Sequence, residues 1–420
     1  MNRFLFFIVF GLLFTLSIQA HAYDLTLAWD DNSEPNIAGY KLYYKTGSPD
    51  GPYDGSGLDQ GGSPIDIPIT QLPDPVNPNF TLRGLDATCD YYFVATAYSD
   101  EDLESDYSNI ATYHANQSPI TDTGQTTSYT DTFGEDSDYT INPQSYTKLD
   151  ENGNDLPDDA GEWVMVRDNV TGLIWEIKTN DGGIHDKDHI YNWYDAHNVF
   201  IATLNNDNFG GYTDWRLPTI RALSMLVHVG MFYPTINTAY FPNAVPDDYW
   251  SNTTGAKYAS DAWSMGFEKG YNGWDLYKTD STYVRAVRGG KLGALGHFED
   301  NGDGTVTDTD TELMWQKAEA GEMDWDQALI YCQNLQLAGY EDWRLPNRNE
   351  LQTFVDFSTY GPAINTVFPV SAWYIRYWSS TTEAMLPGHA WYLDAADGTY
   401  GSAYKGYDRY NYLHCVRCNP

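Results

Sequence analysis

The sequence predicts a multidomain protein in which an all-β sandwich is followed by two α+β domains of one design. Residues 23–113 hold short segments whose apolar side chains alternate at every second position between turn residues, which is typical of antiparallel strands. Beyond residue 148, a set of motifs occurs twice in the same order, which indicates a duplicated domain. With 420 residues, the chain is long enough for three such domains.

The N-terminus has the pattern of a secretory signal peptide. Arg3 precedes an apolar run over residues 4–18, and Ala20-His21-Ala22 places small residues two apart before Tyr23. A membrane anchor is the alternative, but the run is short for a bilayer span, and no later apolar stretch is long enough. We therefore expect residues 1–22 to be removed. The mature protein would be secreted, on the cell surface or periplasmic, where disulfides persist.

The charge balance argues against polyanionic partners. The chain carries 59 Asp and Glu against 23 Lys and Arg, a formal net charge of −36. Nucleic-acid binding rests largely on Lys and Arg that neutralise phosphates, so we expect no nucleic-acid partner. Anionic membrane surfaces are equally poor partners. The 34 Tyr residues instead favour wet surfaces suited to recognition.

Residues 23–113 resemble a fibronectin type III domain. The resemblance rests on Trp29, on the strand sequence of residues 38–44, and on Leu85 placed six residues before Tyr91, the spacing of a tyrosine corner. Such domains usually act as spacers, and we assign this one no chemistry. Residues 114–147 are either a linker or an N-terminal arm of the first repeat.

The repeat is defined by motifs that keep their spacing. Asp214-Trp215-Arg216-Leu217-Pro218 recurs at residues 342–346, and in both repeats Ile-Asn follows the Trp by 21 residues. Tyr-Trp-Ser places its Trp 35 residues after the first one, and Ala-Trp follows 13 residues later. We call residues 148–290 copy 1 and residues 291–420 copy 2. The Trp residues of this shared skeleton are expected in the core: Trp215, Trp250, Trp343 and Trp378.

Two helices are expected early in each copy. In copy 2 the first one carries an apolar face, and Asp324 followed by Gln327 suits its start. The second follows the Leu-Pro pair, with Asn347 as its cap and Glu350 three residues later. Short strands punctuated by Gly come after, which gives an α+β domain. The apolar face consists of Trp325, Ala328, Leu329, Cys332 and Leu335.

Each copy resembles the Lcl C-terminal domain family. The match rests on Trp-Arg-Leu-Pro, Tyr-Trp-Ser, the terminal Val-Arg, and the strands at residues 168–175 and 303–308. The resemblance implies a variant of the C-type-lectin-like fold and a role in surface adhesion and glycan binding. The association of the family with sulfated polysaccharides transfers poorly, because acidic copies would repel them.

A disulfide is expected between Cys332 and Cys415. The equivalent positions of copy 1 lie close to Phe200 and Ala286, so both partners are absent together, as a bridge predicts. The alternative is a pair of free thiols. Cys89 and Cys418 remain, and the sequence does not decide whether they pair.

An acidic segment keeps calcium open as a cofactor. Alternating oxygen ligands occur at Asp150, Asn152, Asn154 and Asp158, as calcium loops require. The segment departs from the EF-hand pattern, since Asp155 stands where Gly is expected. An acidic hairpin turn is the competing interpretation.

The candidate binding surface is aromatic. In copy 2 it runs through Tyr400, Tyr404, Tyr407 and Tyr410, and Tyr271 and Trp274 occupy the matching region of copy 1. Tyr rings suit stacking on sugar faces or docking against a protein. The alternative is that these rings fill the core of their own domain.

The sequence thus favours a secreted, non-enzymatic binding protein with tandem lectin-like domains. Its partner would be a neutral glycan or a surface protein, and two sites on one chain would gain from avidity. Two other classes stay open. One is an envelope enzyme on a lectin-like scaffold, although the sequence offers no catalytic constellation. The other is a structural subunit of a surface appendage.

Overall fold

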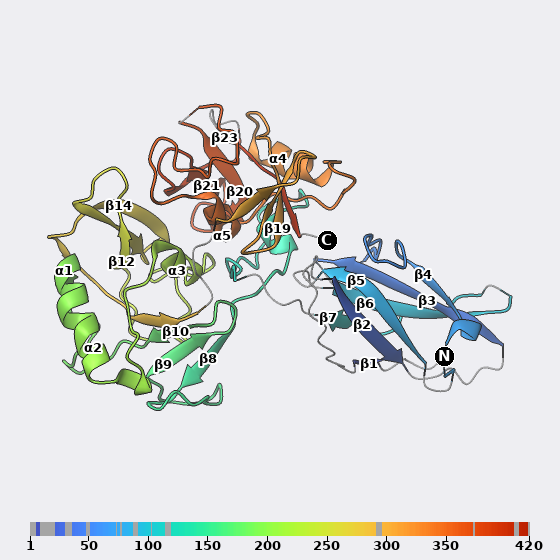
Figure 1. Ribbon diagram of the computed structural model, residues 1–420, viewed down its shortest axis with the longest axis horizontal. Helices are drawn as coiled ribbons and strands as arrows, with labels where there is room; N and C mark the ends of the chain where they lie inside the picture. The colour runs from blue at the N-terminus through green and yellow to red at the C-terminus, as the bar shows by residue number, and fades with distance from the viewer. Residues whose placement is uncertain are drawn as a thin grey trace. The chain divides into compact units, whose positions relative to one another are not determined.

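A computed structural model describes most of the chain and divides it into two compact units. The first unit spans residues 1–117 together with the last three residues, and the second spans residues 118–417 (Figure 1). The described residues are 6–8, 22–29, 36–47, 51–72, 74–75, 78–86, 91–101, 103–113, 119–290, 296–372, 374–406 and 411–418.

The first unit contains two antiparallel sheets around one core. One sheet has the order β1 (Phe6–Ile8), β2 (Ala22–Trp29), β5 (Asn79–Asp86), and the other has the order β4 (Ile65–Pro68), β3 (Ile37–Thr46), β6 (Tyr91–Ser99), β7 (Ala111–Tyr113). Alternate side chains of β3, namely Tyr40, Leu42 and Tyr44, are buried, as a period of two requires. Trp29 packs against Tyr40 with ring centroids 5.0 Å apart. The alternating pattern of residues 23–113 therefore does form antiparallel strands.

Two features of this unit bear on the sequence predictions. Leu85 and Tyr91 are both buried, but the corner between them runs through residues 87–90, outside the described part of the chain. β1 lies in the segment predicted as a signal peptide and pairs with β2. β2 also pairs with β5, so it keeps a partner strand in a chain that begins at Tyr23.

No helix among the described residues is long and apolar enough to cross a membrane.

Copy 1 is built from two main sheets. The first has the order β16 (Val287–Gly289), β10 (Leu173–Glu176), β9 (Met165–Asp168), β8 (Tyr146–Leu149), so the last strand of the copy pairs with one of its first. The second has the order β12 (Asp248–Thr254), β13 (Asp261–Gly266), β14 (Tyr271–Tyr277). A short pair, β11 (Tyr191–Asn192) and β15 (Ser281–Thr282), adds to these.

Copy 2 repeats this arrangement. Its first sheet has the order β24 (Val416–Cys418), β19 (Leu313–Gln316), β18 (Thr305–Asp308), β17 (Phe298–Asp300). Its second has the order β22 (Tyr400–Tyr404), β21 (His389–Asp394), β20 (Arg376–Thr382), β23 (Asn411–Tyr412). Matching strands occur in the same order in both copies, so the duplication that the motifs predict is present in the fold.

The helices are short, and the chain is mostly β-sheet, with 34% strand and 13% helix. Asp324 caps α4 by accepting a hydrogen bond from the Gln327 N–H (2.8 Å), and Asn347 and Glu350 form a capping box at α5. Both caps were predicted. Leu335, predicted on the face of α4, lies beyond its end. The helices are α1 (Trp193–Asp195), α2 (Ala202–Asn206), α3 (Ile220–Met225), α4 (Trp325–Gln333) and α5 (Arg348–Leu351), with a π-helical turn at Ala196–Ile201 that joins α1 to α2.

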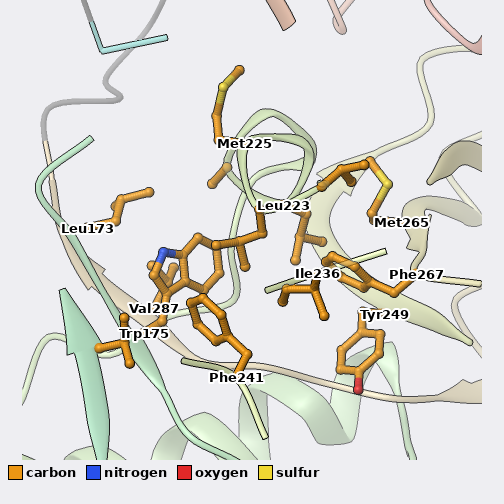
Figure 2. Close-up of a cluster of buried hydrophobic side chains, with 14 of the residues drawn as sticks. Leu173, Trp175, Leu223, Met225, Ile236, Phe241, Tyr249, Met265, Phe267 and Val287 are labelled. Carbon is orange, nitrogen blue, oxygen red and sulfur yellow. The ribbon is translucent and has the colours of Figure 1, made fainter. Parts of the chain in front are cut away.

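Each copy has its own buried core, and Figure 2 shows one cluster of copy 1. There Trp175 of β10 faces Leu223 of α3 and Phe241, so helix and sheet are packed together. The four skeleton Trp residues are each no more than 2% exposed. Their prediction as core residues is therefore confirmed.

Residues 119–145, which we call the arm, lie in the same compact unit as the two copies. The buried Asp136 Oδ2 accepts hydrogen bonds from the Oγ1 atoms of Thr123 (2.6 Å) and Thr381 (2.7 Å). Gln125 Oε1 accepts the N–H of Thr382 at 2.7 Å. The arm is thus hydrogen-bonded to β20 of copy 2 through buried groups.

One buried carboxyl occurs at the same turn of both copies. Asp168 and Asp308 each accept hydrogen bonds from the backbone N–H groups two and three residues later, and burial raises the pKa of each to about 6. A raised pKa in the folded state means that the stabilising contribution is complete below the unfolded pKa near 4 and is lost as the pH rises through about 6. We expect the free energy of unfolding to fall by up to about 3 kcal/mol per carboxyl between about pH 4 and pH 7.

Urea unfolding at a series of pH values checks this dependence. Asp168→Asn and Asp308→Asn remove the titrating group and keep the acceptor oxygen, so each variant should show a weaker pH dependence than the wild type. Equal slopes in the variants and the wild type would contradict the assignment.

Candidate functional site

The two copies meet through equivalent residues. Gln352 donates from Nε2 to Ser224 Oγ (2.9 Å), and the Tyr400 N–H donates to Asn272 Oδ1 (2.7 Å). In both pairs the partners are 128 residues apart, the interval between the skeleton Trp residues of the two copies. Contacts between equivalent residues are what a two-fold axis produces, so the copies pack as a pseudo-symmetric pair.

Arg348 holds this junction together. Its guanidinium is fully buried, lies 4.2 Å from the ring centre of Tyr400 and 4.5 Å from that of Trp391, and donates from Nη2 to the carbonyl of Gly270 in copy 1. Burial lowers its pKa to about 10, which leaves it charged at neutral pH. The edges of β14 and β22 are therefore fixed against each other.

A cavity of about 410 Å³ opens along this junction. Copy 1 supplies most of the wall and copy 2 supplies Thr399. At its edge Asp397 of copy 2 accepts a hydrogen bond from Trp274 Nε1 (3.3 Å) and another from Thr399 Oγ1 (2.7 Å). Carboxylate, hydroxyl and aromatic groups thus share one concave site, where polar groups can fix the orientation of a ligand and aromatic rings can contact it. The lining residues are Asp248, Ser264, Tyr271, Asn272, Gly273, Trp274 and Thr399.

Beside the cavity, three rings surround one ammonium group. Lys257 Nζ lies 4.5 Å from the ring centre of Tyr360, 5.3 Å from that of Tyr258 and 5.7 Å from that of Trp274, and it donates to the Tyr360 hydroxyl at 3.0 Å. Tyr258 is 52% exposed and Tyr360 is 40% exposed. We call Tyr258, Trp274 and Tyr360 the ring cluster. It joins loops of both copies, and Trp274 belongs to the cavity as well.

The aromatic residues predicted from sequence fall in different places. Trp274 is part of the ring cluster, and Tyr271 lines the cavity while its hydroxyl lies 3.2 Å from Glu383 Oε1 and 3.1 Å from Ser402 Oγ. Tyr404 is 62% exposed on β22. Tyr407 and Tyr410 lie outside the described residues.

Tyr400 corrects the prediction of a continuous aromatic surface. Only 4% of it is exposed, its hydroxyl donates to the Arg348 carbonyl (2.7 Å), and its ring stacks on the Arg348 guanidinium. Tyr400 lies in the hydrophobic cluster of copy 2, and its backbone N–H also bonds to Asn272 at the junction between the copies. Tyr400 therefore fills the core of its own domain, which is the alternative that the sequence left open, and it is not a surface residue for ligand contact.

The predicted calcium loop is organised around Asp150. Its Oδ1 accepts the N–H groups of Asn152 and Asn154 (both 2.8 Å), and its Oδ2 accepts from Asn154 Nδ2 (3.0 Å). The carbonyl of Asp158 accepts from Lys148 Nζ at 2.7 Å. The carboxylate oxygens of Asp150 therefore stabilise a turn, and the carbonyl oxygen of Asp158 binds the Lys148 ammonium group. Within the described ranges, no group of three or more His, Cys, Asp or Glu side chains is placed to hold a metal ion.

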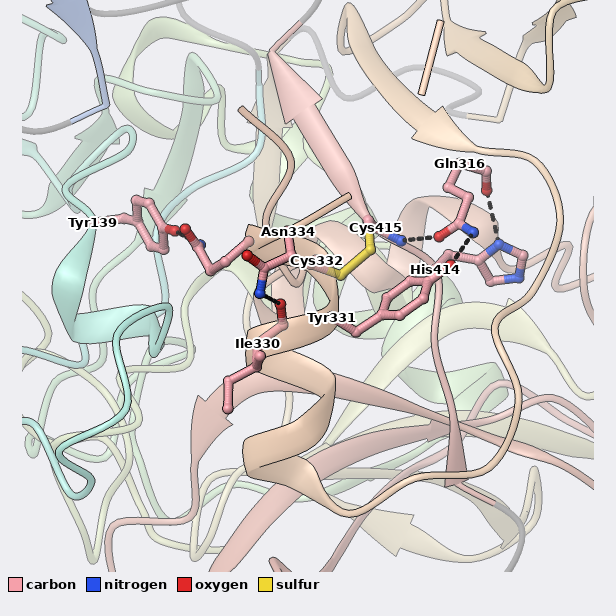
Figure 3. The surroundings of a disulfide bond; sticks show 9 residues. Tyr139, Gln316, Ile330, Tyr331, Cys332, Asn334, His414 and Cys415 are labelled. Carbon is pink, nitrogen blue, oxygen red and sulfur yellow. Dashed lines mark hydrogen bonds between the residues drawn. A yellow bond between two sulfur atoms is a disulfide. The ribbon is translucent and has the colours of Figure 1, made fainter. Parts of the chain in front are cut away.

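The disulfide between Cys332 and Cys415 is confirmed. It joins α4 to the segment just before β24, with 5.5 Å between the Cα atoms, and both cysteines are fully buried (Figure 3). In copy 1 the equivalent Phe200 and Ala286 are buried in one cluster, so packing takes the place of the bridge. Cys89 and the side chain of Cys418 lie outside the described part of the structure.

Several residues of this site were not found from sequence. Tyr258, Lys257 and Tyr360 lie in loops that are not part of the repeated motifs. Asp248 and Ser264 lie in strands whose sequences show no sign of a binding site. A comparison of the two copies could have identified Asp248 and Ser264. At the equivalent positions, 128 residues later, copy 2 carries Arg376 and Tyr392, which differ from them in size and charge.

Comparison with known proteins bears on the second unit alone. The family model of the Lcl C-terminal domain matches residues 164–288 and again residues 304–417, together more than half of the chain. No curated protein shows significant similarity to the chain. The two matched segments correspond to the two copies and include both walls of the cavity.

Proposed function

Since the chain belongs to the Lcl C-terminal domain family, with two copies of the domain side by side, we propose that it is an exported, non-enzymatic binding protein. In this proposal it recognises a glycan or a surface protein outside the cell. Removal of residues 1–22 would deliver it to the envelope or beyond. The first unit would act as a spacer of the fibronectin type III kind, and the copies would be variants of the C-type-lectin-like fold.

The ring cluster is the observation that carries this proposal. Tyr258 and Tyr360 are exposed and Trp274 is partly buried, and Lys257 lies against all three rings beside a polar cavity that Trp274 lines. Clustered exposed aromatic rings are typical of binding surfaces. Tyr and Trp present flat apolar faces with a polar edge, so they stack on sugar rings and still offer hydrogen bonds. Such a surface suits a glycan better than a purely apolar partner.

The charge of the chain narrows the ligand class. A formal net charge of −36 repels sulfated and other polyanionic glycans, and Asp248 and Asp397 add carboxylates at the cavity itself. A hydrogen bond from a sugar hydroxyl to an ionised carboxylate is stronger than one between two neutral groups. We therefore place neutral glycans first among the ligands, with calcium kept as a variable to be tested.

Glycan-array binding of the full chain without residues 1–22 tests the proposal. The double variant Tyr258→Ala/Tyr360→Ala is expected to lose at least about tenfold in apparent affinity, since each stacked ring contributes on the order of 1 kcal/mol. The array should be read with calcium and with a chelator.

Tyr277→Ala is the matched control for that variant. Tyr277 ends the same strand that carries Trp274 and is 60% exposed, but it is not part of the ring cluster. Binding should survive this change. A chain that binds nothing on the array, or a double variant that binds like the wild type, would refute the proposed site.

A further inference from the structure

The cavity occupies one side of a pseudo-symmetric junction, which allows the two sides to be compared. In copy 1, strand register places Asp248 opposite Gly266 and Ser264 opposite Gly273. In copy 2 the same register places Arg376 opposite Asp394 and Tyr392 opposite Gly401. Arg376 is therefore the counterpart of Asp248, and Tyr392 is the counterpart of Ser264.

In copy 2 these two larger side chains fill the corresponding space. The Tyr392 ring lies directly over Gly401, where a Cβ would collide with it. The Arg376 guanidinium stacks on that ring at 4.5 Å from its centre, and its Nε lies 4.0 Å from Asp394 Oδ2. The shorter Asp248 and Ser264 leave the matching volume of copy 1 open as the cavity.

We propose that the cavity of copy 1 binds a single neutral pyranose ring, and that the counterpart in copy 2 is closed to sugars. The inference rests on the proposed function and adds the position of the ligand and its number per chain. Asp248, Ser264 and Thr399 supply acceptors and donors for sugar hydroxyls, and Trp274 supplies the stacking face. A volume of about 410 Å³ has room for one ring with its hydroxyl groups.

The site is composite, because neither copy completes it alone. Copy 2 contributes Thr399 to the wall, Asp397 as the acceptor of the Trp274 indole N–H, and Tyr360, whose ring centre lies 6.1 Å from that of Trp274. The two copies therefore form one binding site together, with most of its lining from copy 1 and the remaining residues from copy 2. Two independent sites that gain from avidity are not required.

Exchanging side chains between the copies tests the inference. The variant Asp248→Arg/Ser264→Tyr places the residues of copy 2 in copy 1, on a backbone that accommodates them in copy 2. Calorimetric titration of the full mature chain with glucose, galactose, mannose and N-acetylglucosamine, and with their neutral oligomers, should give one site per chain for the wild type. The exchanged variant should bind at least about tenfold more weakly, with an unchanged thermal unfolding midpoint.

The reverse exchange, Arg376→Asp/Tyr392→Ser, is the matched control and should retain the first site. Wild-type binding at two sites per chain, or an exchanged variant that folds and binds like the wild type, overturns the inference. If such a variant binds while Tyr258→Ala/Tyr360→Ala does not, the proposed function stands and only the pocket is wrong. If none of these sugars binds and a protein ligand is captured through the ring cluster instead, the sugar pocket is refuted.

Discussion

Replacing both Cys332 and Cys415 by Ala is expected to lower the free energy of unfolding by about 4.5 kcal/mol. The bridge closes a loop of 83 residues. In the chain-entropy model, a loop of that length restricts the unfolded chain by about this amount. Denaturant unfolding of the variant and of the wild type under non-reducing conditions measures the difference.

Copy 1 offers the control for this change. Because it carries Phe200 and Ala286 at the same positions, Cys332→Phe/Cys415→Ala restores buried volume without restoring the bridge. This second variant should therefore be more stable than the Ala pair and less stable than the wild type. Labelling of both thiols in the folded, unreduced wild type would show that the bridge is absent.

The second large effect concerns the ion pair between Arg344 and Glu350. The guanidinium donates to both carboxylate oxygens, at 2.7 and 2.6 Å, and both side chains are buried beside the start of α5. Glu350 Oε2 also accepts the N–H of Asn347, which completes the capping box. Glu350→Ala leaves a buried cation without its carboxylate, so we expect a loss of about 3–5 kcal/mol.

The double variant Arg344→Leu/Glu350→Leu is the control for charge burial. It removes both charges together, so its loss should be clearly smaller than the sum of the two single losses in a double-mutant cycle. Strict additivity would mean that the two side chains do not stabilise each other. In copy 1 the counterpart Arg216 donates instead to the carbonyl of Gly289 (3.1 Å), so a backbone oxygen takes the place of the carboxylate as acceptor.

Sequence reasoning reached the parts of the fold that depend on local pattern. The spacing of the skeleton Trp residues revealed the duplication, Asp324 and Asn347 gave the helix starts, and the joint absence of two cysteines gave the disulfide. Each of these signals lies within one copy or in the comparison of two equivalent positions.

The candidate site depends on how the two copies pack, and no single copy encodes that. Tyr400 was assigned to the aromatic surface because Tyr rings suit stacking, yet it lies in the hydrophobic cluster of copy 2, and its backbone N–H bonds to copy 1. Tyr258 and Tyr360 meet only because the junction brings two loops together around Lys257. Differences between equivalent residues, such as Ser264 and Tyr392, would have been the best available guide.

The position of the bound ligand tests the central claim most directly. Titration of the ¹⁵N-labelled mature chain with a neutral oligosaccharide, followed by the indole N–H signals, reports on each Trp separately. We predict that the Trp274 signal shifts with saturation at one sugar per chain, while those of the buried skeleton Trp residues stay in place. Saturable binding that leaves the Trp274 signal unmoved would place the ligand elsewhere and contradict the account.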